Sequence, residues 1–533
     1  MHDLLNEPLI GVRTHRGEHR VNLPELLAAL SSGAVEGYTG LRAHQADPWH
    51  VFLVQLAASI QARHPTEALP TNAAYWREGL LDLAEGIPEA WHLVVEDVTK
   101  PAFLQHPWKS WDAEAADYGV KTSRGQVLFD PKATTPDELD VLVTAKNHDV
   151  KMARARPSAE EAWVFALMML QTTSGFLGKG NYGIVRMNGG FASRSIAAWA
   201  RERGVSSRFI DEVRALARLR EGVCRELRYP QRGTVLTWLT PWNRKGHQHT
   251  LSQLEPWFIE AARPIRLCLL ADGRLLALGA TSEVRQIGPK TVENGDVGDP
   301  WTVINVGDKK KGRSALTLSE EGFTPQRLTD LLFEQGFELT PLQKPQPGEG
   351  VGWFIASCLV RGQGKTEGFH RAEIAVPAAA RRALLQPARR ETLGQLARTL
   401  LGDAKDTQKA LGTALTVLTE GGPDKADFER VEAWVKAVRS QFASHWEQHY
   451  FPTLWRGADE PHEAVRSHWQ QRLVETGQAL LDAASTRLPL PSNRRWRALI
   501  QAQSAWRGML HKAGLTLPGR GAPNPVETEE QPA

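Results

Sequence analysis

The segment RGQGKTEGFHR, residues 361–371, has the composition of a nucleotide-binding loop. Gly364-Lys365-Thr366 matches the end of a phosphate-binding P-loop, in which backbone amides and a lysine hold the phosphates. That motif also needs a glycine five positions before the Gly-Lys pair, and Leu359 stands there. A P-loop leads from a strand into a helix, whereas the residues after Lys365 predict a second strand. The spacing therefore predicts the tip of a β-hairpin and argues against ATP hydrolysis.

The histidines offer no better catalytic centre. His445 and His449 in HWEQH are four residues apart, as in zinc proteases, but Trp446 stands where that motif has its glutamate. His247 and His249 have no partner cluster with the spacing of metal ligands, so we interpret all four histidines as surface, loop or capping residues. The three cysteines are scattered and form no CxxC pair, which is typical of a reducing cytoplasm and predicts no metal site.

A second glycine cluster, SGFLGKGNYGIVRMNGG over residues 174–190, surrounds Lys179 and Arg186. Glycine lets a backbone come close to a ligand, because it has no Cβ, and it tolerates positive φ. Such a loop beside basic side chains suits a sugar–phosphate backbone or the floor of a nucleic-acid groove. A flexible turn without a ligand explains the same composition equally well, so the residues alone leave both interpretations open.

Two basic segments could hold phosphates. The chain as a whole carries a net charge of only +3, but residues 371–520 hold 22 Lys and Arg against 15 Asp and Glu. Clustered basic side chains fit contact with a polyanion, and solvated helix faces give the same count. The candidates lie in VGDKKKGRS and NRRWRALIQAQSAWR and are Lys309, Lys310, Lys311, Arg494, Arg495 and Arg497.

Two patterns of sequence meet near residue 375 and predict an α+β fold. Before it, short apolar runs predict strands at 9–14, 234–239, 301–307 and 352–360 and a hairpin over 264–280, while helical periodicity appears at 23–31, 51–62, 159–171 and 192–220. After it, apolar residues recur at helical spacing over 378–402, 407–420, 426–449, 462–485 and 494–514. We expect a large mixed N-terminal domain (1–374), a C-terminal antiparallel bundle of about four helices (375–520) and a disordered acidic tail (521–533).

Taken together, these segments resemble one family over nearly the whole chain: CasA, the large subunit of the type I-E CRISPR surveillance complex (Cascade). The order of motifs carries the likeness. EPLIGVR…VNLPELL comes first, then PAFLQ, VLVTAKNHDVK and the glycine cluster after an apolar helix. LTWLTPW…LEPWFIEAARPIRL, GDPWTVI and RGQGKTEGFHR follow, and a helical region closes the chain.

The resemblance implies a subunit that is not an enzyme, has no cofactor or metal ion, and reads the short PAM in double-stranded DNA to start R-loop formation. In that family a glycine loop, a lysine finger and a glutamine wedge read the PAM. The loop is matched here by Gly175, Gly178, Lys179, Gly180 and Asn181; the finger by Lys290, with Lys309 to Lys311 as rivals; and the wedge by Gln363, flanked by Gly362, Gly364 and Lys365.

The resemblance also implies partners. These are the crRNA, the target DNA, the backbone, small and handle-binding subunits, and a helicase–nuclease that is recruited to the target. A polar segment at about 106–158 corresponds to the family's loop that contacts the 5′ handle of the guide RNA, with Asn147, His148 and Asp149 as its anchor. We expect a cytoplasmic protein without a membrane segment, since no apolar run approaches the roughly 20 residues that span a bilayer.

Two other hypotheses remain at this stage. A DNA-processing enzyme, either an ATPase or a metal-dependent nuclease, would use GQGKT or HWEQH. A structural scaffold would contact protein partners only, and its basic segments would be solvated helix faces.

Overall fold

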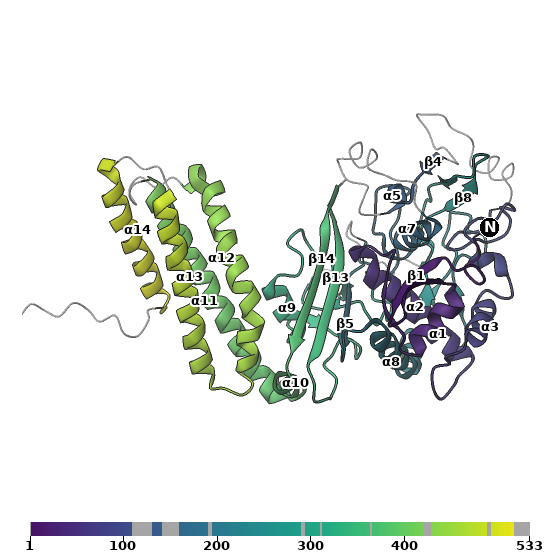
Figure 1. Ribbon diagram of the computed structural model, residues 1–533, viewed down its shortest axis with the longest axis horizontal. Coiled ribbons are helices and arrows are strands. Elements are labelled where there is room, and N and C mark those ends of the chain that lie inside the picture. Colours follow the sequence, from purple (N-terminus) through teal and green to yellow (C-terminus); the bar gives the residue numbers. More distant parts are fainter. Residues whose placement is uncertain are drawn as a thin grey trace, which may run out of the picture. The chain divides into compact units, whose positions relative to one another are not determined.

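The structure, a computed structural model, divides the chain into two compact units that meet in sequence at Val376 and Pro377. It describes residues 2–108, 130–140, 159–189, 194–288, 294–309, 312–362, 365–420, 428–487 and 492–515. The first unit mixes helices with strands, and the described residues of the second are almost entirely helical (Figure 1). The predicted α+β class with a C-terminal helical bundle is confirmed.

Helix α2 (Ala43–Arg63) is the core helix of the first unit. Nearly all of its residues from His44 to Ile60 are buried, because the helix is largely apolar around its circumference and packs against three helices and strand β7. The other helical elements of this unit are α1 (Leu23–Ser31), α3 (Ala73–Leu83), α5 (Pro136–Leu139), α7 (Glu160–Thr173), α8 (Val205–Leu227), α9 (Pro325–Leu332) and the 3₁₀ turns η1 (Pro88–Trp91) and η2 (Leu251–Gln253).

The described strands of this unit form several small sheets rather than one large sheet. Their orders are β2-β1-β3, β11-β10-β12, β14-β13-β5, β4-β9-β8 and β6-β7, and only the β6-β7 pair is parallel. The strands are β1 (Ile10–Thr14), β2 (Gly17–Val21), β3 (Val35–Tyr38), β4 (Asp130–Ala133), β5 (Ile196–Ala200), β6 (Thr234–Leu236), β7 (Leu254–Ile259), β8 (Ile265–Leu269), β9 (Leu275–Gly279), β10 (Ile304–Asn305), β11 (Ser314–Ala315), β12 (Phe337–Glu338), β13 (Gly352–Gly362) and β14 (Lys365–Val376).

Local sequence signals explain several of these elements. Helix α1 covers the predicted range 23–31, and it starts at a capping box in which Asn22 and Glu25 bond each other's backbone amides. The predicted hairpin over 264–280 is the β8-β9 pair, and its turn places Gly273 at a φ of 82°. Both predictions are confirmed because they rest on short-range chemistry that tertiary packing does not override.

One prediction in this unit was wrong. Residues 192–220 were expected to be one helix, but Ile196–Ala200 forms strand β5, and α8 begins only at Val205. The segment IAAWA is rich in alanine, a strong helix former, yet all five residues are buried and pair with β13. Pairing with a central strand outweighs helix propensity here. The predicted strands at 234–239 and 301–307 are also shorter, at three and two residues.

The long polar segment expected at about 106–158 contains regular structure. Strand β4 pairs with β9, and the short helix α5 follows it with a capping box at Thr135. The other predicted features of this segment, including Asn147, His148 and Asp149, lie outside the described residues.

The second unit consists of α10 (Ala378–Leu385), α11 (Pro387–Glu420), α12 (Phe428–Arg456), α13 (His462–Arg487) and α14 (Ser492–Lys512). Helix α11 packs against each of the last three, which stand side by side with it in Figure 1. The predicted helix over 378–402 is interrupted, because Pro387 starts a new helix that runs without a break through the second predicted segment. Buried Trp469 donates from its indole nitrogen to the Leu400 carbonyl (2.9 Å) and so ties α13 to α11. Within the described residues, no helix combines the length and the apolar character needed to cross a bilayer.

Candidate nucleic-acid interface

The glycine segment continues from the end of α7 into a tight turn with Lys179 at its tip. The Leu177 amide donates to the Asn181 carbonyl (2.9 Å), and the Asn181 amide donates to the Gly178 carbonyl (2.9 Å). Gly178 has a φ of 117°, which a residue with a Cβ adopts only with strain. Lys179 is exposed, and no described residue forms an ion pair or hydrogen bond with its side chain. The turn therefore presents an accessible peptide beside an unpaired ammonium group.

The glycines of this segment serve two different purposes. A Cβ added to Gly178 would meet nothing within 4 Å, so the space above this peptide is open. A Cβ on Gly180 would lie 2.8 Å from the Thr281 Cβ, and one on Gly183 would lie 2.7 Å from the carbonyl carbon of Gly175. Packing within the unit therefore requires Gly180 and Gly183, whereas the Gly178 peptide is open to an incoming ligand.

Arg263 holds the two ends of the glycine segment together. Its Nη2 donates to the Gly175 carbonyl (2.7 Å), and its Nη1 donates to the Tyr182 carbonyl. The Arg263 amide donates to Gln171 Oε1 (2.6 Å), and Gln171 Nε2 donates to the Arg263 carbonyl (2.8 Å). Since Arg263 is buried, this guanidinium is a structural clamp and not a phosphate ligand.

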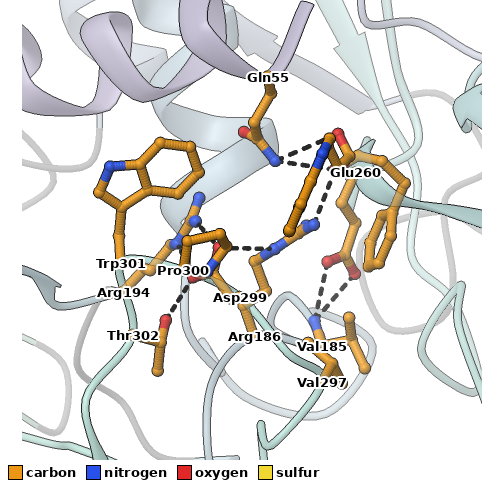
Figure 2. Close-up of polar contacts among 12 residues, drawn as sticks. Gln55, Val185, Arg186, Arg194, Glu260, Val297, Asp299, Pro300, Trp301 and Thr302 are labelled. Carbon is orange, nitrogen blue, oxygen red and sulfur yellow. Dashed lines mark hydrogen bonds and ion pairs between the residues drawn. The ribbon is translucent and has the colours of Figure 1, made fainter. Parts of the chain in front are cut away.

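A buried ionic network around Asp299 involves the residues that follow the glycine turn (Figure 2). Arg194 donates to both carboxylate oxygens of Asp299, from Nε at 2.9 Å and also from Nη2. Arg186 Nε lies 3.4 Å from Asp299 Oδ1, and the Thr302 hydroxyl donates to Oδ2 (2.5 Å). Burial alone would raise the pKa of Asp299, but Arg194 and Arg186 outweigh it and hold the pKa below its usual value. Asp299 therefore stays ionised between two buried arginines.

Glu260 fixes the next part of the same segment (Figure 2). Both of its carboxylate oxygens accept the Val185 amide, at 3.0 and 2.9 Å. Burial, only partly offset by Arg186, raises the pKa of Glu260 to about 7. Arg186 itself donates to the Phe258 carbonyl (2.8 Å), and its guanidinium lies 3.8 Å from the centre of the Phe258 ring. The Arg186 side chain is therefore buried and bound within the protein, whereas Lys179 in the same glycine cluster is exposed.

The RGQGKTEGFHR stretch lies at the end of a long β-hairpin, as predicted. Strands β13 and β14 pair antiparallel from Gly352 and Val376 to Gly362 and Lys365. The two residues between the strands, Gln363 and Gly364, lie outside the described part of the chain. Because a strand, and not a helix, follows Gly364-Lys365-Thr366, the P-loop interpretation is excluded by the fold as well as by the spacing.

An ion pair between exposed Arg371 and buried Asp47 anchors this hairpin to helix α2. Arg371 Nε on β14 donates to Asp47 Oδ2 (3.0 Å), and Arg208 Nη1 on α8 donates to Asp47 Oδ1 (3.1 Å). Burial opposes ionisation of Asp47, but Arg208 and Arg371 outweigh it and lower the pKa to about 2. Strand β14 is thus fixed to the core helix about midway along the hairpin, where Arg371 lies opposite Ser357, and strand β5 pairs with β13 on the other side.

Comparison with known proteins relates this arrangement to solved structures. A scan of protein-family models and a search of curated proteins returned no match. The CRISPR-associated protein Cse1 from Acidimicrobium ferrooxidans is 15% identical, with a TM-score of 0.62, over 96% of this chain and 98% of its own. Thermus thermophilus CasA (Cse1) is 14% identical, with a TM-score of 0.59, over 96% and 99% of the two chains. A chain of a CRISPR RNA-guided surveillance complex is 14% identical, with a TM-score of 0.53, over 95% and 99%.

The chain has the Cse1 fold. At such low identity the likeness shows architecture and not activity, but it spans both units of this chain and almost all of each neighbour.

Within this Cse1 fold, the structure describes only part of the predicted lysine-finger region. Lys309 is exposed in the connection between β10 and β11, and Lys290, Lys310 and Lys311 lie outside the described residues. Arg313, at the other end of this connection, is bound to Asp296 and Glu338 and so is already neutralised.

The predicted basic residues of the second unit lie together on one helix. Arg494, Arg495 and Arg497 are all exposed in the first turns of α14. His445 and His449 lie on α12 on either side of buried Trp446, and within the described residues no group of three or more His, Cys, Asp and Glu side chains could hold a metal ion.

Sequence reasoning missed the residues that hold the glycine segment in place, although they lie inside motifs already singled out. Glu260 and Arg263 belong to LEPWFIEAARPIRL, and Asp299 belongs to GDPWTVI. In LEPWFIEAARPIRL the sequence did carry a signal: Glu260 and Arg263 stand next to an apolar run. A charged residue that is buried with such a run needs a polar partner inside the protein. The identity of those partners, Arg194 for Asp299 and the Val185 amide for Glu260, depends on the fold.

Proposed function

We propose that this chain is the non-catalytic large subunit of a type I-E CRISPR RNA-guided surveillance complex, which recognises the PAM in double-stranded DNA and starts R-loop formation. The observation that carries the proposal is the match of the whole chain to Cse1 structures, including one in an RNA-guided surveillance complex. The open peptide of the glycine turn and the long hairpin, which leads to Gln363 in the sequence, support it.

The glycine turn is the proposed groove reader. The open Gly178 peptide can approach a groove closely, and Lys179 adds a cation for an adjacent phosphate. In the minor groove, A·T and T·A pairs present similar acceptors, and the guanine amino group is the main distinguishing feature. A reader built from peptide groups and one lysine finger, Lys290 or one of Lys309 to Lys311, therefore accepts several related PAM sequences.

The hairpin tip is the proposed wedge. Gln363, flanked by Gly362, Gly364 and Lys365, would enter between base pairs beside the PAM. Inserting a side chain into the base stack costs a few kcal/mol, and the pairing of guide RNA with the opened strand offsets this cost. A wedge must resist that load, and the Arg371–Asp47 ion pair ties strand β14 to the core helix midway along the hairpin.

The remaining partners follow from the same proposal. The crRNA handle would be contacted by the segment at about 106–158, with Asn147, His148 and Asp149 as its anchor. Other Cascade subunits would bind the same region, and the helicase–nuclease would be recruited after the duplex opens. The basic first turns of α14 would contact the DNA backbone outside the PAM.

The test is duplex binding by the reconstituted complex with Gln363→Ala or Lys290→Ala in this chain. We expect each substitution to weaken binding to a PAM-bearing duplex at least tenfold, a loss of about 1.4 kcal/mol. A target with its strands already separated beside the PAM should restore binding to the Gln363 variant. Arg225→Ala, at an exposed arginine on α8 that pairs with Glu221, is the matched surface control.

Three results would contradict the proposal. Unchanged duplex binding in both variants would remove the site assignment. ATP hydrolysis or metal-dependent nuclease activity that disappears in Lys365→Ala or His445→Ala would favour a DNA-processing enzyme. If the complex binds DNA with the same affinity and the same salt dependence whether or not it contains this chain, the chain is better explained as a scaffold that contacts protein only.

A further inference from the structure

Helix α14 differs from an ordinary surface helix in its charge. Its 21 residues, SNRRWRALIQAQSAWRGMLHK, include Arg494, Arg495, Arg497, Arg507 and Lys512 and no Asp or Glu. Exposed helices of soluble proteins usually mix both signs, because pairs of opposite charge three or four residues apart stabilise the helix. The four arginines are exposed, and no described residue forms an ion pair with them.

The position of three of these arginines is unfavourable for the helix itself. The first turns of a helix carry a partial positive charge, so acidic residues stabilise them and basic residues destabilise them, by about 0.3–1 kcal/mol each. Arg494, Arg495 and Arg497 stand in these turns, and the first turn has no acidic residue. An anion bound at this end would relieve the repulsion and would also meet free backbone amides.

Large apolar side chains are exposed on the same end of the helix. Trp496 is 75% exposed and Ile500 is 67% exposed, the highest values among the large apolar residues that the structure describes. They are not needed for packing, because α14 already buries Ala498, Trp506 and Leu510 within the bundle. An exposed tryptophan between arginines offers a flat ring for stacking with cations on both sides.

A groove runs from these residues along the helix. It has a volume of about 670 Å³, and its lining includes Trp496, Ile500, Ser504, Arg507, Gly508 and His511. Small side chains at Ser504 and Gly508 leave room, and Arg507 and His511 place further basic groups at the far end. At 1.5 Å per residue, Trp496 and His511 are about 22 Å apart along the axis.

We propose that this outer face of α14 binds a single strand of nucleic acid, with a base stacked on Trp496 and phosphates held by the flanking arginines. Proteins that bind single strands without sequence preference combine a basic groove with aromatic side chains in this way. A nucleic-acid strand fits this face better than a protein, because each nucleotide supplies a phosphate for an arginine as well as a base for the ring, whereas a protein would need a separate carboxylate for each arginine. The inference rests on the proposed function for the source of the strand, which would be DNA opened beside the PAM.

The test measures binding of a fluorescent oligothymidylate to the full-length chain at low salt. Stacking of one base contributes about 1–3 kcal/mol, so Trp496→Ala should weaken binding by between about fivefold and about 150-fold. Trp496→Phe should keep most of the affinity, and Trp496→Leu, which keeps apolar area without an aromatic face, should lose as much as the alanine variant. Leu385→Ala on α10, an apolar residue that is 42% exposed, is the matched control.

The outcomes separate this inference from the proposed function. Oligothymidylate binding that is unchanged in Trp496→Ala would overturn the stacking site. Weaker oligothymidylate binding in Trp496→Ala with full affinity in Trp496→Leu would show that apolar area, and not an aromatic face, makes the contact, and would also overturn the stacking site. If Trp496→Ala weakens single-strand binding while Gln363→Ala and Lys290→Ala leave duplex binding unchanged, the α14 site stands and the PAM-reading proposal fails.

Discussion

Asp299→Asn should destabilise the first unit far more than a comparable change at the surface. The carboxylate lies between Arg194 and Arg186, and each of these three residues is at most 4% exposed. The asparagine amide keeps one acceptor but turns an NH₂ group toward a guanidinium, so two buried cations lose their counter-charge. Removing one partner of a buried ion pair costs about 3–5 kcal/mol, and we expect a loss of that size.

Glu338→Gln is the matched control. Glu338 also pairs with an arginine, Arg313, but both side chains are about half exposed. Exposed pairs contribute about 0–1 kcal/mol, and Arg313 keeps Asp296 as a second partner. The two substitutions change the same chemical group, so the difference between them isolates the effect of burial.

Hydrogen exchange followed by mass spectrometry is the appropriate assay, because it resolves the two units and does not require a single two-state transition. Peptides from 174–189 and 194–200 should exchange at least a hundredfold faster in Asp299→Asn, since each 1.4 kcal/mol changes the opening equilibrium tenfold. Peptides from α11 and α13 should be unaffected. Equal protection in Asp299→Asn and Glu338→Gln would refute the conclusion that a buried network supports the glycine turn.

Two further predictions concern pH and salt. Because the pKa of Glu260 is raised to about 7 from 4.5, the folded state holds a proton that the unfolded state loses; the stabilisation is complete below about pH 4.5 and is lost as the pH rises through 7. The free energy of unfolding of the wild-type protein, measured by thermal denaturation, should therefore fall by about 3 kcal/mol between pH 4.5 and 7. Glu260→Gln should remove this dependence of stability on pH. Replacing Arg494, Arg495 and Arg497 with Gln should flatten the dependence of oligothymidylate affinity on salt, by about 0.7 in the logarithmic slope per lost phosphate contact, without lowering the melting temperature.

Features with a short-range cause could be predicted from the sequence. The β8-β9 hairpin follows from Asp272-Gly273 between two apolar runs, and the absence of a P-loop follows from Leu359. Helix α1 follows from its capping box. Each depends on residues within about ten positions, so no knowledge of the fold is needed.

Features with a long-range cause could not be predicted. Strand β5 exists because β13, more than 150 residues later, pairs with it, and nothing in IAAWA indicates this. The difference between Gly178 and Gly180 also has a long-range cause. Gly180 packs against Thr281, about 100 residues later, while Gly178 faces open space. A glycine cluster in a sequence can therefore indicate a close approach, but the fold decides whether a ligand or the protein itself makes it.

The near-neutral net charge of this chain hides two populations of arginine in different surroundings. In the first unit, Arg194 and Arg263 are buried, and carboxylates or carbonyls take up their charge, so they position the glycine turn and are unavailable to DNA. In the second unit, Arg495 and Arg497 have no ion-pair partner among the described residues, at the end of a helix that would be more stable without them. Structural arginines lower the cost of their own burial by pairing, whereas ligand-binding arginines must stay unpaired until the ligand arrives. The surfaces on which a polyanion can bind are therefore identified by basic residues that lack a partner within the folded chain, and not by the count of basic residues.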